Sequence, residues 1–384
     1  MNEAAHNAAL LPAGLRDLLP PEAEEEAAAV ESLMSAFAAH GYQRVKPPLL
    51  EFEDTLFAGS GAAVADQTFR LMDPDTHRPM GVRADITPQV ARIAATRLAH
   101  APRPLRLSYS GQCLRVRGAS QLAPDRQIAQ AGFELIGPDH PAADAEMVLV
   151  GAEALAALGV GRLSFDLTLP PLVPTLLEDS GVPSPDRASI ARALDRKDAA
   201  AVANAGGRLA GMLAKLLLAS GPADGALAAL DAAKLSGGAR ALADRLAAVV
   251  AVVRARSPGL RLTVDPVEFR GFRYHTGVSL TVFAPGRAEE FGRGGRYVCG
   301  EGEPATGLTL YPDAVLRAAP PRASRPRIYL PPQADPARAA ALRAEGYATV
   351  AGFDAEACAA REAQRLGCSH YLGDGGALAA TAEG

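Results

Sequence analysis

Hydrophobic and polar residues alternate along Gln127–Ile136, which is the most informative pattern in the chain. At the two-residue period of a β-strand, the apolar residues fall on one face, and Gln130, Gly132 and Glu134 fall on the other. An amide and a carboxylate are costly to bury against packed apolar side chains, but with a glycine between them they can line a pocket roughly 13 Å long. That length suits an amino acid or a nucleoside. The alternative is a polar strand face wetted by solvent.

The segment Leu105–Arg117 before this strand is predicted to be a second strand. A small polar loop, Gly118–Asp125, joins the two, so they are expected to form an antiparallel pair. Arg115 lies near the turn of this pair.

Helical periodicity dominates the N-terminal part of the chain. Residues Glu22–His40 carry an apolar stripe and stop at Gly41, so they predict one helix. Further on, Thr87 is a suitable N-cap and Pro88 a suitable first residue for a second helix that reaches about Ala99. On this interpretation Asp85 and Thr87 are either helix-capping residues or part of a site.

Three later patterns suggest the domain organisation. Residues 172–256 are rich in alanine and leucine at helical spacing, which predicts an all-helical insertion into a core of residues 1–320. The glycine-rich segment Gly292–Tyr297 is typical of a hairpin. A proline-rich linker then leads into a βαβαβ pattern, so residues 327–384 are expected to form a small C-terminal α/β domain.

Composition narrows the range of functions. The chain of 384 residues has 39 Lys and Arg against 43 Asp and Glu, a net charge of −4, and no run of basic residues. These values argue against a nucleic-acid partner. The four cysteines show no metal-binding spacing, so we expect reduced thiols and neither a metal nor a cofactor. Without a signal sequence or a long apolar run, the protein is expected to be soluble and cytoplasmic, away from membranes.

The strand pair that contains Arg115 closely resembles motif 2 of class II aminoacyl-tRNA synthetases, in the form found in histidyl-tRNA synthetases. Residues Arg83–Pro88 are similar to the histidyl-tRNA synthetase stretch Arg-Pro-Glu-Gly-Thr, with Asp85 in place of the glutamate. Residues 270–277 resemble its signature Arg-Gly-Leu-Asp-Tyr-Tyr-Thr-Gly; Arg270 and Tyr274 match, and His275 replaces the second tyrosine. The resemblance implies an α+β fold, with a class II synthetase-like antiparallel sheet flanked by helices.

The same resemblance implies a pocket for histidine. Asp85, Thr87 and Gln130 would hold the α-ammonium group. The imidazole would meet Glu134 and either Tyr274 or His275. Arg270, and Arg115 as a second candidate, would bind the carboxylate through charge-assisted hydrogen bonds.

The nucleotide side departs from the synthetase pattern at two positions. Arg117 stands where motif 2 has the glutamate that accepts from the adenine amino group, so two donors now face each other. Ala314 stands where motif 3 has an arginine that stacks on adenine. We therefore expect no effective ATP binding, no adenylation of an amino acid and no catalytic residues in this chain.

A histidyl-tRNA synthetase-like core with an altered ATP site and a short C-terminal domain resembles the family of ATP phosphoribosyltransferase regulatory subunits. The resemblance implies a short-form catalytic subunit as partner, histidine as the feedback effector, and a homodimer within a larger hetero-oligomer that starts histidine biosynthesis. Two alternatives remain open: a divergent histidyl-tRNA synthetase, and a free-standing amino-acid sensor.

Overall fold

The computed structural model of the chain describes residues 10–118, 124–268, 274–284, 286, 289–322, 324–373 and 378–381. The chain divides into two compact units, Met1–Pro320 and Pro321–Gly384. No helix within the described residues is both long enough and apolar enough to cross a membrane.

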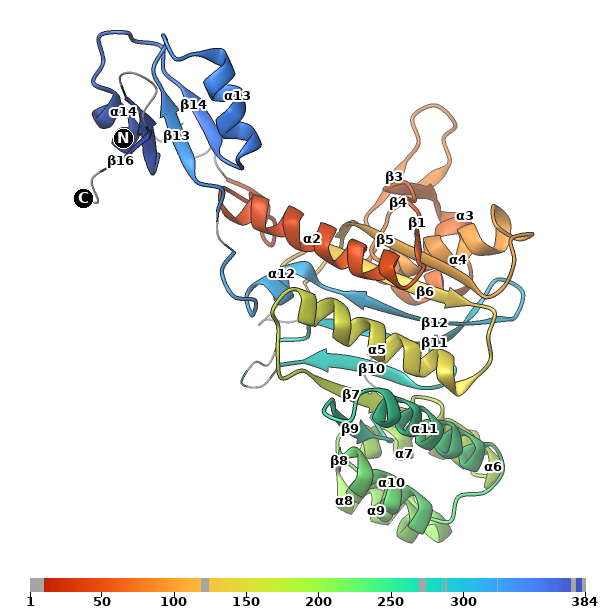
Figure 1. The fold of residues 1–384 in the computed structure, drawn as a ribbon. Helices are drawn as coiled ribbons and strands as arrows, with labels where there is room; N and C mark the ends of the chain where they lie inside the picture. The colour runs from red at the N-terminus through yellow and green to blue at the C-terminus, as the bar shows by residue number, and fades with distance from the viewer. Residues whose placement is uncertain are drawn as a thin grey trace. The chain divides into compact units, whose positions relative to one another are not determined.

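A mixed sheet forms the centre of the first unit (Figure 1). In the described part of the chain its strand order is β1 (Gln43–Arg44), β5 (Leu105–Leu114), β6 (Gln127–Ile136), β12 (Glu303–Leu310), β11 (Gly292–Cys299), β10 (Ser279–Phe283), β7 (Ser164–Thr168), β9 (Arg261–Asp265) and β8 (Gly221–Pro222). Most neighbours are antiparallel, whereas β1 and β5, and likewise β7 and β9, are parallel. The pocket strand β6 is therefore an interior strand between β5 and β12, with no solvent-wetted edge.

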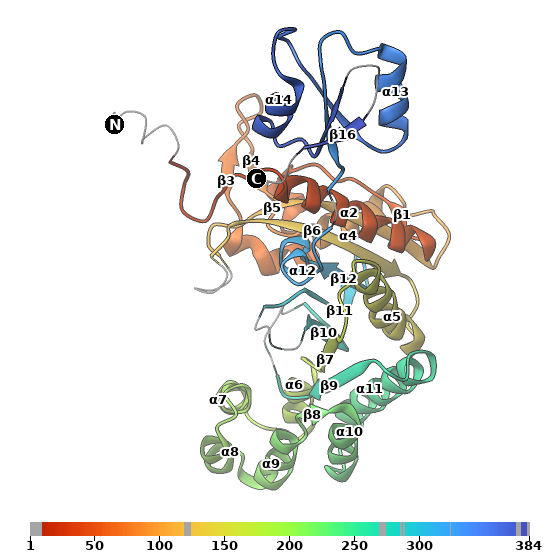
Figure 2. The same ribbon diagram turned by 60° about the vertical axis from the view of Figure 1, so that its left-hand side comes forward.

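Helices α2 (Glu22–Ala39) and α5 (Pro141–Ala157) cover one face of this sheet, and Figure 2 shows α2 lying across β5 and β6. The predicted stripe of α2 supplies Phe37, whose ring lies 4.9 Å from that of Phe133 on β6. Tyr42 packs edge-on to the same ring at 4.8 Å. The apolar face of β6 thus forms the main core.

The opposite face carries α4 (Thr87–Thr96) and a smaller core. Val90 and Ala94 of α4 are fully buried in the same cluster as Tyr109 of β5. Because Tyr109 pairs with Gly132, this is the face onto which Gln130 and Glu134 project. A three-stranded sheet, β2 (Leu50–Phe52), β4 (Pro79–Val82) and β3 (Arg70–Met72), precedes α4, with α3 (Glu53–Leu56) and the 3₁₀ helix η1 (Gly59–Gln67) among its strands.

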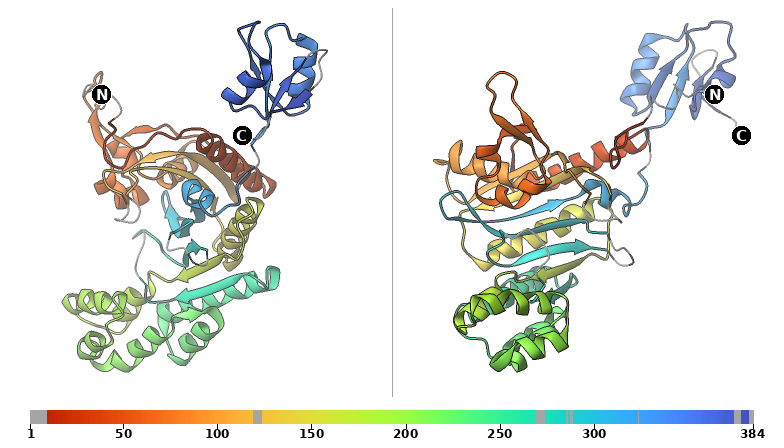
Figure 3. Two further views of the ribbon diagram at one scale, coloured as in Figure 1. Left: turned by 90° about the vertical axis from the view of Figure 1, so that its left-hand side faces the viewer. Right: turned by 180° about the vertical axis from the view of Figure 1, so that it is seen from behind.

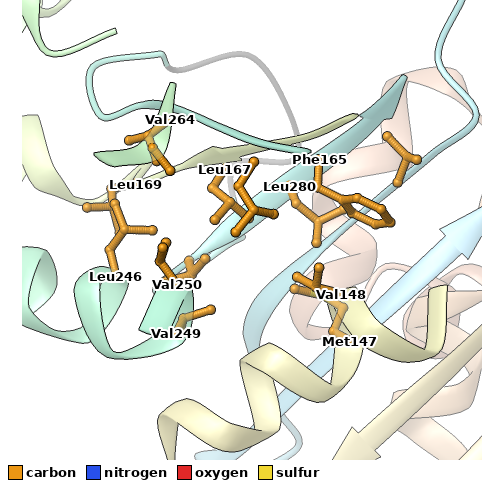
Figure 4. Packing of buried hydrophobic residues seen from close by; sticks show 14 of the residues in the cluster. Met147, Val148, Phe165, Leu167, Leu169, Leu246, Val249, Val250, Val264 and Leu280 are labelled. Atoms are coloured by element: carbon orange, nitrogen blue, oxygen red, sulfur yellow. The ribbon is translucent and has the colours of Figure 1, made fainter. Parts of the chain in front are cut away.

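Residues 172–256 form helices at the β9–β8 end of the sheet (Figure 3), apart from the short strand β8, which pairs with β9, so the predicted insertion is not entirely helical. Those described are α6 (Leu172–Asp179), α7 (Ser184–Asp195), α8 (Ala199–Ala205), η2 (Gly207–Leu209), α9 (Ala210–Leu218), α10 (Ala223–Ala232) and α11 (Gly237–Arg256). Figure 4 shows Leu246 and Val250 of α11 packed with Leu167 of β7 and Val264 of β9. The insertion and the sheet therefore share one hydrophobic core.

The predicted hairpin is present: Gly292–Tyr297 belong to β11, which pairs antiparallel with β12 across a turn at residues 300–302, so the glycines lie in the strand and not in the turn. Its glycines serve close packing: a Cβ at Gly294 would lie 2.2 Å from the carbonyl oxygen of Gly307. Within the insertion, the chain turns between α7 and α8 at Lys197, whose φ is +56°.

The second unit has its own four-stranded sheet in the described residues, in the order β14 (Ala348–Ala351), β13 (Arg327–Leu330), β15 (His370–Leu372) and β16 (Leu378–Ala380). The first three strands are parallel, and α13 (Pro336–Ala344) and α14 (Ala359–Arg365) connect them. The last strand, β16, pairs antiparallel with β15 and was not predicted.

Candidate ligand-binding site

Four of the predicted site residues meet between the start of α4 and the sheet. Asp85 and Thr87 come from the turn into α4, and Gln130 and Glu134 from β6. Their exposed fractions are 2%, 5%, 1% and 1%, respectively. Buried polar side chains of this kind need partners, and their hydrogen bonds show which groups are already used.

Thr87 does not cap α4. The helix begins at Thr87, and the residue before it makes no side-chain capping bond. Instead the Thr87 hydroxyl donates to Glu134 Oε1 at 3.0 Å and lies 3.0 Å from the Tyr109 hydroxyl. Tyr109 also donates to Glu134 Oε1, at 3.1 Å, and contacts the Thr309 hydroxyl at 2.7 Å. One oxygen of Glu134 is thus fixed by two hydroxyl groups.

The other oxygen of Glu134, Oε2, faces Gly307 of β12 and lies near the hydroxyl of Tyr297 on β11. Among the described residues, neither this oxygen nor the Tyr297 hydroxyl has a partner at full hydrogen-bond geometry, although the two groups lie close enough for Tyr297 to lower the pKa of Glu134. Burial raises the pKa of the Glu134 carboxyl to about 8, against the opposing influence of the nearby Tyr297, Thr87 and Tyr109 hydroxyls. At neutral pH this carboxyl group is mostly protonated, so it can donate a hydrogen bond as well as accept one.

Asp85 is the second buried carboxylate of the site. Its Oδ1 accepts a long hydrogen bond from the Thr87 backbone N–H at 3.4 Å. Burial raises the pKa of Asp85, whereas the Arg115 guanidinium and a Gln130 hydrogen bond oppose the rise. Gln130 Oε1 already accepts from the Ile86 N–H at 3.1 Å and from Cys113 Sγ at 3.3 Å. The amide of Gln130 therefore positions Asp85.

Arg115 brings a positive charge to the same site. It is only 9% exposed, and its Nε donates to the carbonyl of Ala84 at 3.3 Å. Within the described ranges, its Nη2 has no hydrogen-bond partner. A buried guanidinium nitrogen without an acceptor is costly, so this atom is a natural contact for an anionic ligand group.

Tyr274 and His275 lie beside this cluster. The ring of Tyr274 is perpendicular to that of Tyr297, with centroids 5.9 Å apart. Partial burial, and then the carboxylates of Asp85 and Glu134, raise the pKa of the Tyr274 phenol. His275 packs on Tyr274 at 4.8 Å and lies over Gly295. Burial and the Arg293 guanidinium lower the pKa of His275 to about 4, so its imidazole is neutral.

The structure thus brings together six of the eight predicted residues, namely Asp85, Thr87, Arg115, Gln130, Glu134 and Tyr274. His275 lies at the side of the cluster, towards Arg293. Arg270, a predicted carboxylate ligand, lies outside the described residues.

Three members of the site were not predicted: Tyr109, Tyr297 and Thr309. Tyr109 could have been found, because the antiparallel pair places its ring opposite Gly132, beside the predicted polar face. Tyr297 and Thr309 lie on β11 and β12, and their approach to β6 depends on the strand order. No local sequence signal gives that order.

The site combines groups that can pair with both charges of a small zwitterion. Within the described ranges, no three His, Cys, Asp or Glu residues cluster to hold a metal ion. Arg117 is exposed, and Ala314 is buried in α12 (Pro312–Leu316). The Asp85 carboxylate can bind an ammonium group, and the Arg115 guanidinium can bind a carboxylate. The protonated Glu134 carboxyl group can bind a further polar group.

The chain has relatives at the level of sequence. The histidyl-tRNA synthetase family model matches residues 14–315. The chain is 56% identical to the ATP phosphoribosyltransferase regulatory subunit of Gluconobacter oxydans over 371 residues, which is 97% of each chain. It is 55% identical to the regulatory subunit of Paramagnetospirillum magneticum over 376 residues, covering 98% of this chain and 99% of the relative.

Two solved structures have a similar fold. A Bacillus halodurans protein described as an ATP phosphoribosyltransferase regulatory subunit/histidyl-tRNA synthetase has a TM-score of 0.77 at 22% identity, covering 93% of this chain and 96% of that one. Histidyl-tRNA synthetase from Nostoc has a TM-score of 0.76 at 17% identity, covering 94% and 90%. The predicted class II synthetase-like α+β fold is therefore confirmed.

Proposed function

The chain belongs to the family of ATP phosphoribosyltransferase regulatory subunits, and from this premise we propose that it binds histidine beside α4 and regulates a separate catalytic subunit. The names of its relatives support a regulatory role in histidine biosynthesis. The observation that carries the histidine proposal is a set of three buried polar atoms that lack a partner at full hydrogen-bond geometry among the described residues: Arg115 Nη2, whose guanidinium lies near Asp85, and the neighbouring Glu134 Oε2 and Tyr297 hydroxyl.

Each end of a histidine zwitterion has a matching group in this site. Asp85 would accept from the α-ammonium group, with Gln130 and the Thr87 backbone holding the carboxylate in place. Arg115 would take the α-carboxylate through its unused Nη2. The buried charges of Asp85 and Arg115 would then each meet an opposite charge, which offsets part of their desolvation.

The imidazole would be recognised by Glu134 and Tyr297. A neutral imidazole has one N–H donor and one acceptor nitrogen. A protonated Glu134 with a free Oε2, next to the Tyr297 hydroxyl, can satisfy both, because each group can donate or accept. Amino acids that lack these two groups would leave both pocket atoms unpaired, at a cost of about 1–3 kcal/mol each.

The regulatory step requires a partner. We propose that the partner is a short-form ATP phosphoribosyltransferase catalytic subunit. It would join a homodimer of this chain in a hetero-oligomer, and this chain would supply no catalytic residue. Histidine would inhibit by binding the inactive state of the complex more tightly than the active state. A difference of about 1–3 kcal/mol, or roughly 5- to 150-fold, is typical of such coupling.

Calorimetry with histidine tests the pocket. We expect binding by the wild-type chain and a loss of about tenfold or more in Glu134→Leu, which keeps a similar volume but removes both the donor and the acceptor. Glu153→Leu is the matched control, because Glu153 is an exposed residue on α5. Equal histidine affinity in both variants would contradict the pocket assignment.

Reconstitution tests the regulatory role. We expect the chain to co-purify with a short catalytic subunit, to raise its phosphoribosyltransferase activity and to make that activity sensitive to histidine. A catalytic subunit that is fully active and histidine-sensitive alone would contradict the proposal. Histidine-dependent exchange between ATP and pyrophosphate by this chain would instead support a histidyl-tRNA synthetase.

A further inference from the structure

A second cavity, of about 590 Å³, lies between the helical insertion and the sheet. Its walls come from α6, α11 and β11, and they include Leu242 and Val298. A volume of this size is in the range that encloses small organic ligands, which is about 300–1,000 Å³. The lining includes Tyr297, which also belongs to the histidine site, but none of the carboxylates of that site.

Two arginines line this cavity from opposite sides. Arg245 projects from α11, and Arg296 from β11. Both hold Asp144 of α5, which is completely buried: Arg245 Nε and Arg296 Nε each donate to it at 2.8 Å. One carboxylate thus balances one of the two guanidinium charges inside the protein.

Asp139 balances the second guanidinium charge from the surface. Its Oδ1 lies 2.7 Å from Arg245 Nη1 and 3.5 Å from Arg296 Nη1, yet the side chain is 66% exposed. Water screens this ion pair on the side of Asp139, although both guanidinium groups are largely buried. Asp139 therefore marks a solvent-accessible anion position between two guanidinium groups.

In the described part of the chain one donor of this pair is unused, on Arg245, whereas Arg296 Nη1 also donates to the carbonyl of Pro138 at 3.3 Å. Among the described residues, Arg245 Nη2 is buried and has no hydrogen-bond partner. Arg296 Nη2 lies 2.7 Å from Asp144 Oδ1, although without the geometry of a hydrogen bond. The planar forks of two arginines match the oxygens of a phosphate or carboxylate group.

We propose that this cavity is a second ligand site, which takes a small organic anion. Its phosphate or carboxylate group binds Arg245 and Arg296 in place of Asp139, and its organic body packs against Leu242 and Val298. Because α11 belongs to the insertion and β11 carries Tyr297, a ligand here touches both the insertion and a strand of the histidine site. The assignment is independent of the proposed binding of histidine.

Titration calorimetry of the full chain with AMP, citrate and inorganic phosphate tests this site. AMP or citrate is expected to bind more tightly than inorganic phosphate, because only these two have an organic body. Arg245→Gln should weaken that binding by about tenfold or more. Asp139→Asn should strengthen it about two- to fivefold, because the variant removes the competing carboxylate.

Matched variants separate this site from general effects. Arg240→Gln removes an exposed arginine from the same helix, outside the cavity, and should leave anion binding unchanged. Glu134→Gln should also leave it unchanged, and Arg245→Gln should leave histidine binding unchanged. If Arg245→Gln fails to fold, Arg245→Lys is the alternative, because it keeps a positive charge beside Asp144. It should still weaken anion binding, because lysine lacks the planar fork of a guanidinium group.

The proposal is overturned if neither AMP nor citrate binds in the millimolar range, or if neither binds more tightly than inorganic phosphate. It is also overturned if Asp139→Asn fails to strengthen binding. Since the histidine titration is a separate measurement, failure of one site leaves the result for the other intact.

Discussion

Gly307 lies directly opposite Glu134 in the β12–β6 pair, and a Cβ on Gly307 would sit 1.8 Å from Glu134 Oε2. The carboxyl group thus occupies the space that any other side chain at position 307 would fill. The placement of Glu134 in the pocket depends on this glycine.

Gly307→Ala is therefore expected to displace Glu134 and weaken histidine binding by about tenfold or more. Overpacking should also lower the free energy of unfolding by about 1–3 kcal/mol. Calorimetry and urea unfolding measure the two effects. Gly259→Ala is the control, since its Cβ would meet no atom within 4 Å. Undiminished histidine affinity in Gly307→Ala would show that Glu134 does not read the ligand.

The raised pKa of Glu134 makes stability depend on pH. Between the ordinary value of 4.5 and about 8, the native state binds a proton that the unfolded state has lost. The free energy of unfolding should therefore fall as pH rises through this window, by up to about 1.4 kcal/mol per pH unit from this group. Urea unfolding at about pH 6 and about pH 7.5 should show a smaller decrease in Glu134→Gln. Equal decreases in the wild type and in Glu134→Gln would contradict the raised pKa of Glu134.

His275 has the opposite effect at lower pH. Its pKa is lowered from 6.5 to about 4, so the unfolded state binds a proton in this window that the native state does not. The contribution of His275 to stability should be lost as pH falls from about 6.5 to about 4. Acid unfolding of His275→Gln should begin at lower pH than that of the wild type. The exposed His100→Gln should behave as the wild type does.

Two tyrosine variants separate ligand recognition from stability. Tyr297→Phe removes a buried hydroxyl without a hydrogen-bond partner among the described residues, so the free energy of unfolding should stay equal or rise by up to about 1 kcal/mol. Histidine binding should nevertheless weaken. Tyr42→Phe removes a 2.9 Å bond to Glu146 and should cost about 0.5–1.5 kcal/mol, with histidine affinity unchanged. Destabilisation by Tyr297→Phe, measured in urea, would mean that its hydroxyl has a structural role.

The core beneath the pocket strand should be sensitive to truncation. Phe37 is fully buried against Phe133, so Phe37→Ala should lower the free energy of unfolding by about 3–5 kcal/mol. Leu218 is 81% exposed, so Leu218→Ala should change the free energy of unfolding by no more than about 0.5 kcal/mol. A loss of similar size in both variants, measured by urea unfolding, would contradict this core.

Local patterns predicted the helix α2 and the two faces of β6, because both depend on the periodicity of neighbouring residues. These patterns gave wrong predictions where a residue's role depends on a contact with a residue far away in the sequence. Thr87 has the sequence context of an N-cap, but its hydroxyl bonds Glu134, 47 residues further on. The glycines of β11 have the composition of a turn, whereas they lie in the strand and allow the backbone of β12 to approach closely.

The amino-acid sequence by itself determined the secondary structure of most of the core and the polar residues from which the candidate site is built, because periodicity and residue chemistry act locally. The tertiary structure decided which of these residues meet. The order β5–β6–β12–β11 brings Tyr109, Glu134, Thr309 and Tyr297 to one buried face. Burial there raises the pKa of Glu134, and such a shift arises only where the folded chain removes water from a charge.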